Sequence, residues 1–154
     1  MSEHQQAHRT YPSTAVANCF LALAKEDNIP LTNLKIQKLI YFANGVYLAA
    51  TGVPLVDEPF QAWSYGPVLL KLYSLLRVFR NSPITIERLP TTETIDTGSQ
   101  AYAIIIGVWD RLKKYTAWQL VELTHQDGSP WHKAVSKGRF TVIDNQDLKQ
   151  YFSN

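Results

Sequence analysis

The stretch from residue 32 to residue 52 constrains the fold most, because it holds the strongest helical pattern in the chain. Thr32 is a suitable N-cap, and Gly52 followed by Pro54 is a suitable C-terminal stop. The pattern therefore predicts a long helix with one buried face. The apolar residues of that face recur three and four residues apart: Ile36, Leu39, Ile40, Ala43, Tyr47 and Ala50.

Similar periodicity predicts further helices, so we expect a mainly α fold: a single compact domain of about six to seven helices with a few short β-strands. Residues 1–12 are expected to be a polar N-terminal tail and residues 13–154 the domain. The other helices are predicted at about 13–27, 67–79, 99–115, 116–125, 130–137 and 144–152. The short strands are predicted at 60–63, 84–86 and 140–143.

Composition excludes several classes of function. The 15 basic and 13 acidic residues leave a net charge of +2, which is too small to favour nucleic acid or an anionic membrane. One cysteine, Cys19, excludes an intramolecular disulfide, and four scattered histidines give no zinc pattern. No apolar run approaches the ~20 residues that cross a bilayer, and the polar N-terminus lacks a signal-peptide core. We expect a cytoplasmic protein without metal or cofactor.

Residues 34–42 contain the first of three distinctive segments. Lys38 lies one position from the apolar face of the long helix, and Gln37 lies opposite part of that face. The two side chains either anchor a neighbouring loop or partner, or belong to an ordinary amphipathic helix whose lysine stretches out to solvent. The residues alone favour the second interpretation.

Residues 62–68 form the second segment, in which Trp63 and Tyr65 flank a predicted turn. Gly66 leads into a helix that starts at Pro67, where the missing N–H costs nothing. The free N–H groups of that helix start could receive a carboxylate. The alternative is a purely structural turn, which we favour because the proline removes one donor.

Residues 123–132 form the third segment and bring His125, Ser129 and His132 into one turn region. A hydrolase would use Ser129 as nucleophile and His125 as base, but Ser129 is placed to cap a helix and the G-x-S-x-G elbow is absent. The two histidines lack evident further metal ligands. We therefore expect His125 to lock the loop by hydrogen bonds, and we expect no enzymatic activity.

Together the three segments resemble the Panacea-domain family, the SocA-like and GepA-like (phage-associated) proteins. The family patterns L-x-x-Q-K-L-x-Y-F, A-W-x-Y-G-P-V and L-T-H-x-x-x-x-P-W are matched, in that order, by residues 34–42, 62–68 and 123–131. The resemblance leaves open whether the matched residues hold the fold or touch a partner. They are Gln37, Lys38, Tyr41, Trp63, Tyr65, Gly66, Pro67, Thr124, His125, Pro130 and Trp131.

The resemblance implies an antitoxin of a type II toxin–antitoxin system, which neutralises a co-encoded toxin by direct protein–protein binding. Two alternatives remain: an adaptor that delivers a toxin to a Clp-type protease, or a phage or prophage accessory protein of unknown role. We expect the partner to meet the exposed residues 81–98 and the adjacent helix end, a placement suited to a variable loop on a rigid scaffold. The tentative partner-binding residues are Arg77, Phe79, Arg80 and Arg88.

Overall fold

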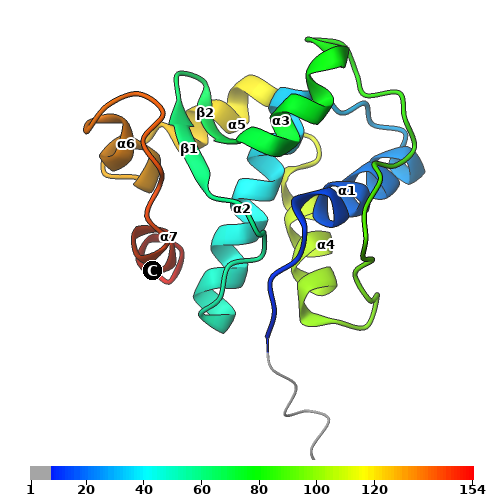
Figure 1. Cartoon of the computed structure of the whole chain (residues 1–154), viewed down its shortest axis with the longest axis horizontal. Coiled ribbons are helices and arrows are strands. Elements are labelled where there is room, and N and C mark those ends of the chain that lie inside the picture. Colours follow the sequence, from blue (N-terminus) through cyan, green and yellow to red (C-terminus); the bar gives the residue numbers. More distant parts are fainter. Residues whose placement is uncertain (1–7) are drawn as a thin grey trace, which may run out of the picture.

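The computed structural model describes residues 8–154 and confirms a mainly helical, compact domain (Figure 1). Seven α-helices, a 3-10 turn and two short strands follow one another within these residues. They are α1 (Ser13–Asp27), α2 (Asn33–Thr51), β1 (Phe60–Trp63), β2 (Gly66–Leu69), α3 (Leu70–Leu76), η2 (Arg77–Phe79), α4 (Gln100–Leu112), α5 (Ala117–Thr124), α6 (Pro130–Val135) and α7 (Asn145–Phe152).

Helix α2 is the axis of the domain, and the other elements surround it (Figure 1). It packs against α1, α3, α4, α5, α7 and β2. The predicted caps are present, because the Thr32 hydroxyl accepts the Lys35 N–H at 3.2 Å and Gly52 adopts φ +83°. The predicted apolar face accounts for only part of the surface that α2 buries. Polar residues on the opposite side of α2 are buried as well, whereas Ala50 is exposed, because helices cover α2 from several directions.

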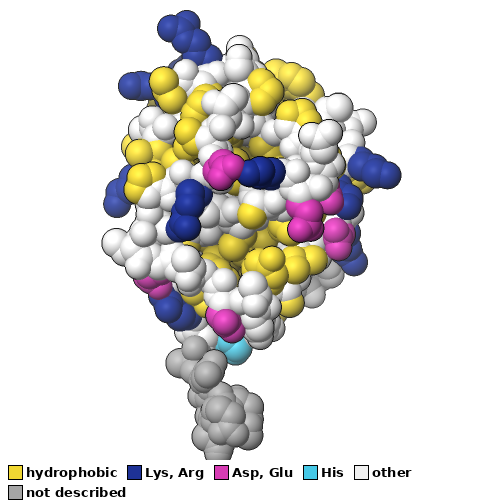
Figure 2. Space-filling model, turned by 90° about the vertical axis from the view of Figure 1, so that its right-hand side faces the viewer, with side chains coloured by type: hydrophobic (Ala, Val, Ile, Leu, Met, Phe, Trp, Pro, Cys, Tyr) yellow, Lys and Arg dark blue, Asp and Glu magenta, His cyan; other side chains and the backbone are white. Residues whose placement is uncertain are grey.

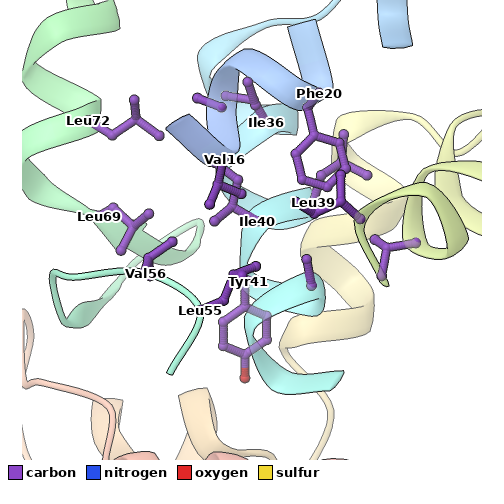
Figure 3. Packing of buried hydrophobic residues seen from close by; sticks show 14 of the residues in the cluster. Val16, Phe20, Ile36, Leu39, Ile40, Tyr41, Leu55, Val56, Leu69 and Leu72 are labelled. Carbon is purple, nitrogen blue, oxygen red and sulfur yellow. The ribbon is translucent and has the colours of Figure 1, made fainter. Parts of the chain in front are cut away.

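The hydrophobic core forms where α1 and α3 meet α2 (Figure 3). Phe20 from α1 and Leu72 from α3 are completely buried and flank the aliphatic residues of α2. The side chain of Tyr41 extends from the same helix away from this aliphatic cluster, and its ring packs edge-on against Phe60 and Phe152. Aromatic rings occur in both parts of the core, because Phe20 also packs against the buried Trp109 of α4, with ring centroids 6.5 Å apart.

Local capping chemistry sets most of the other helix ends. Ser129 and Asp144 cap α6 and α7, and Thr116 forms a capping box with Gln119. Helix α1 differs, because its N-cap is Pro12 rather than Ser13 or Thr14.

The Ser13 hydroxyl is engaged elsewhere, donating to the buried carboxylate of Glu58 at 2.7 Å. The same carboxylate accepts the backbone N–H groups of Lys71 and Leu72 at the start of α3. Glu58 therefore links the first turn of α1 to the first turn of α3, where a negative charge is favourable.

The predicted helix start at Pro67 is wrong, because residues 66–69 form a strand. Strand β2 pairs antiparallel with β1, and Trp63 lies opposite Gly66. Glu58 accepts the first free N–H groups of α3, so the helix begins only at Leu70. Strand pairing brings Gly66 and Pro67 against α2 instead of exposing them at a helix end.

Two predicted strands do not form as such. Residues 84–86 stay irregular, although the Ile84 N–H donates to the Leu31 carbonyl at 2.7 Å. Residues 140–143 form a single bridge, between Val142 and Gln61, beside the free edge of β1. Phe140 has φ +68°, which is incompatible with a continuous strand at that point.

The start of the domain remains a prediction, since residues 1–7 lie outside the described residues. Within the rest of the predicted tail, Tyr11 is buried and its N–H donates to the Leu55 carbonyl at 2.8 Å. The Thr10 hydroxyl donates to the Pro54 carbonyl at 2.7 Å. Residues 10–12 are therefore attached to the folded part of the chain.

A glycine allows α7 to pack closely on α2. A Cβ atom on Gly45 would lie 2.3 Å from the ring of Phe152. We expect Gly45→Ala to displace this ring from Tyr41 and to lower the free energy of unfolding by about 1–3 kcal/mol in urea titrations. The control is Gly107→Ala in α4, which has open space in the described structure and should gain about 0.5–1 kcal/mol from helix propensity. Equal stabilisation by both substitutions would contradict the close packing.

Candidate functional site

The three sequence segments meet at the β1–β2 hairpin. From α2, the Gln37 carbonyl oxygen accepts the Leu69 N–H at 2.9 Å, and the Gln37 amide donates to Asn33 at 3.1 Å. The next residue, Lys38, donates its ammonium to the Pro67 carbonyl at 3.1 Å. Adjacent side chains of one helix thus satisfy two backbone groups of β2.

Lys38 is completely buried, which corrects the prediction that its ammonium reaches solvent. Burial lowers the pKa of this lysine to about 7, because the charged form loses its hydration. A lysine ammonium has three N–H donors, and only the bond to Pro67 is present within the described structure. Burying a lysine ammonium with a single hydrogen bond lowers the free energy of unfolding of the domain.

Gly66 makes room for the lysine. It has φ +105°, and a Cβ atom there would lie 2.6 Å from Cε of Lys38 and 2.9 Å from the Thr124 hydroxyl. A side chain at this position would therefore meet both the first and the third segment. The glycine is explained by this close approach and by its positive φ.

The third segment is held by its own hydrogen bonds and by the hairpin. The Ser129 hydroxyl donates to the Thr124 carbonyl at 2.9 Å and accepts the His132 N–H at 3.1 Å. The Trp131 indole N–H donates to the Trp63 carbonyl at 2.8 Å. Pro130 occupies the first turn of α6 and is buried. The Ser129 hydroxyl is therefore engaged as a cap, as predicted, and is not free as a nucleophile.

Within the part of the chain that the structure describes, the His125 side chain makes no hydrogen bond to the loop, contrary to our expectation. Its imidazole stacks on Trp131 with ring centroids 3.7 Å apart and an interplanar angle of 9°. The buried Nε2 has no hydrogen-bond partner within residues 8–154. Burial first, and then the positive charge of Lys38, lower the pKa of His125, which favours the neutral ring. The sequence does not predict this stacking, because His125 and Trp131 lie six positions apart across an irregular turn, where no helix or strand spacing indicates which side chains meet.

Tyr41 lies one helical turn beyond Gln37 and Lys38 on α2, and its ring packs against Phe60 of β1 and Phe152 of α7. Burial raises the pKa of its hydroxyl well above the usual value, and this hydroxyl lacks a partner in the described part of the chain. Between residues 8 and 154, no three His, Cys, Asp or Glu side chains come close enough together to hold a metal ion. No helix in the same range is long and apolar enough to span a membrane.

The tentative partner-binding residues separate into two groups. Arg77 and Arg80 line a cavity of about 660 Å³ beside the hairpin, together with Tyr65 and Trp118. Phe79 is half-buried against the core, and Arg88 lies on the exposed segment between η2 and α4. The sequence does not predict the cavity, because its walls come from three stretches, 32–38, 65–81 and 117–118, that are distant from one another in sequence.

The segment between η2 and α4 is fixed to the domain at several points. Leu89 is buried, and its backbone exchanges two hydrogen bonds with the Asn18 side chain. Glu87 forms an ion pair with Lys25. Figure 2 shows the face that this segment crosses, where acidic and basic side chains are interspersed with hydrophobic ones. That face lacks the single-sign field that nucleic acid would require.

A family model described as Antitoxin SocA-like, Panacea domain, matches residues 36–132 and so includes most of the three segments. The chain belongs to this family. Antitoxin SocA of Caulobacter vibrioides (strain NA1000 / CB15N) is 32% identical over 140 residues, which cover 82% of this chain and 71% of that relative. No solved structure matches the chain significantly.

The contact between Gly66 and Lys38 gives a testable feature of this Panacea domain. Gly66→Ala should destabilise the fold by about 1–2 kcal/mol more than Gly128→Ala, since overpacking adds to the cost of a positive φ. Gly128 is the matched control, because it also has a positive φ, +79°, but open space around it within the described structure. Thermal and urea unfolding measure both. Equal losses would contradict the close approach to Lys38.

The buried lysine should make stability depend on pH. Between pH 7 and pH 9 the folded state has released the Lys38 proton while the unfolded state retains it, so stability rises with pH. Relative to Lys38→Met, wild type should gain about 2 kcal/mol over this interval. Urea titrations at both pH values measure the difference. The exposed-site variant Lys114→Met should keep the wild-type slope, and an unchanged slope in Lys38→Met would contradict the buried ammonium.

Proposed function

We propose that this protein is an antitoxin that neutralises a co-encoded toxin by direct protein–protein binding, as in type II toxin–antitoxin systems. The family and the relative named Antitoxin SocA support the antitoxin role, because the similarity extends over most of the chain. Direct binding is the finer part of the proposal, and it is supported by the geometry of the three segments.

One observation favours binding over catalysis: most polar side chains of the family segments bond within the domain, and the two buried groups without a partner in residues 8–154, the Tyr41 hydroxyl and His125 Nε2, belong to rings packed against other aromatic rings. Gln37 and Lys38 bond to β2, and the Ser129 hydroxyl bonds to the backbone on both sides. His125 is stacked rather than paired with a nucleophile. A general base must lie within hydrogen-bond reach of the group it activates, and no such pair occurs here. We therefore propose that the chain acts without catalysing a reaction.

Occlusion by binding requires a surface rather than a reaction centre. Stable protein–protein interfaces bury roughly 1,600 Å² and are anchored by aromatic and arginine side chains. Tyr65 and Trp118 are each more than half exposed, at 59% and 56%, and Arg77 and Arg80 are also exposed nearby. This combination of side chains is suited to a protein partner.

The test is co-expression with the product of the adjacent reading frame. We expect growth arrest by that product alone, recovery when this chain is present, and co-elution of the two purified proteins as one complex. The amount of toxin in the recovered cells should stay constant, as measured by immunoblotting after translation is stopped. No recovery would refute the antitoxin role.

Two outcomes of the same experiment separate the alternatives. Recovery accompanied by rapid loss of toxin that depends on a Clp-type protease would identify an adaptor instead. If recovery depended on catalysis by the histidines, the double variant His125→Gln, His132→Gln would lose it although its thermal stability stayed unchanged. We expect that variant to keep binding the toxin when it is folded, with any loss of function explained by a lower Tm.

A further inference from the structure

The cavity beside the hairpin combines several unusual features. It is formed by the N-terminal turn of α2, the β1–β2 turn, the α3–η2 end and the start of α5, and its volume is about 660 Å³. A volume of this size is within the range of sites that hold small molecules or a few side chains of a partner. It adjoins the place where the three family segments meet, because Gln37 and Lys38 are also in its wall.

The charge in the cavity has one sign. Lys38, Arg77 and Arg80 line it, and no aspartate or glutamate is among its lining residues. Within residues 8–154, none of these three side chains forms an ion pair. The other exposed face, over α1 and residues 80–99, has its charges largely interspersed by sign. The cavity is therefore a local positive site on a nearly neutral chain.

Lys38 strengthens this argument because it lines the same cavity and is completely buried. Its ammonium has a single hydrogen bond, to a backbone carbonyl, and no carboxylate partner in the described structure. Without a counter-ion, burial favours the neutral amine above about pH 7, and an anion placed in the cavity would favour the charged ammonium.

Two aromatic rings give the cavity an apolar edge. Tyr65 and Trp118 meet edge to face, with ring centroids 5.1 Å apart, and more than half of each side chain is exposed. The remaining aromatic residues of the family segments are more deeply placed, as with Trp131 at 9% exposure. The exposed pair is available to an apolar group that enters together with the anion.

Arg80 is held in a strained backbone conformation at the rim. Its φ is +53° and its ψ is −123°, a combination that suits glycine and is costly for other residues. This residue nevertheless is among those that line the cavity, and it is exposed. Strain of this kind clusters at binding sites, where the side chain is worth its cost in stability.

We propose that this cavity binds a segment of the toxin that presents a carboxylate next to an apolar side chain, with Arg77 and Arg80 on the carboxylate and Tyr65 and Trp118 on the apolar group. The inference rests on the proposed function, because the partner is the toxin. A peptide is favoured over nucleic acid since two arginines in a compact cavity do not make the extended basic groove that tracks a phosphate backbone.

The first experiment reverses the charge of the rim in the full-length chain. Arg77→Glu with Arg80→Glu should weaken binding to the purified toxin by about 100-fold in calorimetry, since a repulsive pair replaces an attractive one. The matched control, Arg111→Glu with Arg139→Glu, carries the same change in net charge on exposed positions outside the cavity and should change Kd by less than about 3-fold. Both variants should keep the wild-type Tm within about 2 °C.

A suppressor selection identifies the toxin groups. Cells that express the reversed variant are selected for growth against a library of toxins with single Asp→Lys or Glu→Lys changes, and survivors are retained only if their toxin still kills alone. Suppressors at one or two neighbouring acidic positions support the proposal. Two outcomes would overturn it. Either no suppressor appears, or the toxins of the surviving cells still kill alone and bind wild-type antitoxin as tightly as the unchanged toxin does.

The strained arginine gives a second, independent variant. Arg80→Gly should raise the Tm by about 2–4 °C, because glycine adopts this backbone freely, while weakening toxin binding about 10-fold or more. A purely structural role for Arg80 predicts unchanged affinity, which would refute its place in the site.

The outcomes distinguish the two proposals. If wild type does not bind the toxin, the proposed function fails. If wild type binds and the reversed variant binds equally well, the antitoxin role stands and the cavity proposal fails. A 20-nucleotide single-stranded RNA serves as the competing probe in fluorescence anisotropy. Loss of RNA binding in the reversed variant, with toxin binding intact, would assign the cavity to nucleic acid and overturn the proposal.

Discussion

The hydrogen bonds that Gln37 and Lys38 make to the backbone of β2 are the constraint on which the rest of the structure depends. They hold the hairpin on α2, and the hairpin in turn holds α6 through Trp63 and Trp131. Elements from three distant parts of the chain are thereby joined at one place. The cost is a buried ammonium, which an ordinary hydrophobic contact would have avoided.

Much of the fold was predictable because helix ends are encoded locally. Thr32, Gly52, Thr116 and Ser129 act at the ends that the sequence indicates. The failures have a common origin in contacts between distant residues. Pro67 reads as a helix start in isolation, and it becomes part of a strand because Glu58 and Gln37 take the neighbouring backbone donors.

The sequence predicts which residues belong to the candidate site, but not how they are arranged in space. The family resemblance indicates the residues around the hairpin, and the sequence predicts Arg77 and Arg80 as partner-binding residues from their place at the end of a helix. The burial of Lys38 could not be inferred, since one helix seen alone offers the lysine a route to solvent. The pairing of Tyr65 with Trp118 joins segments more than fifty positions apart in the sequence, and periodicity carries no information at that range.

The packing of α7 on α2 has a consequence for how the protein is made. Tyr41 and Phe42 are covered by Phe152, a residue of the last helix, although α2 leaves the ribosome early. Until α7 has been synthesised, the aromatic side of α2 stays open to proteases and to other chains. Truncated products that stop before residue 145 should therefore be short-lived, so that only chains carrying α7 accumulate.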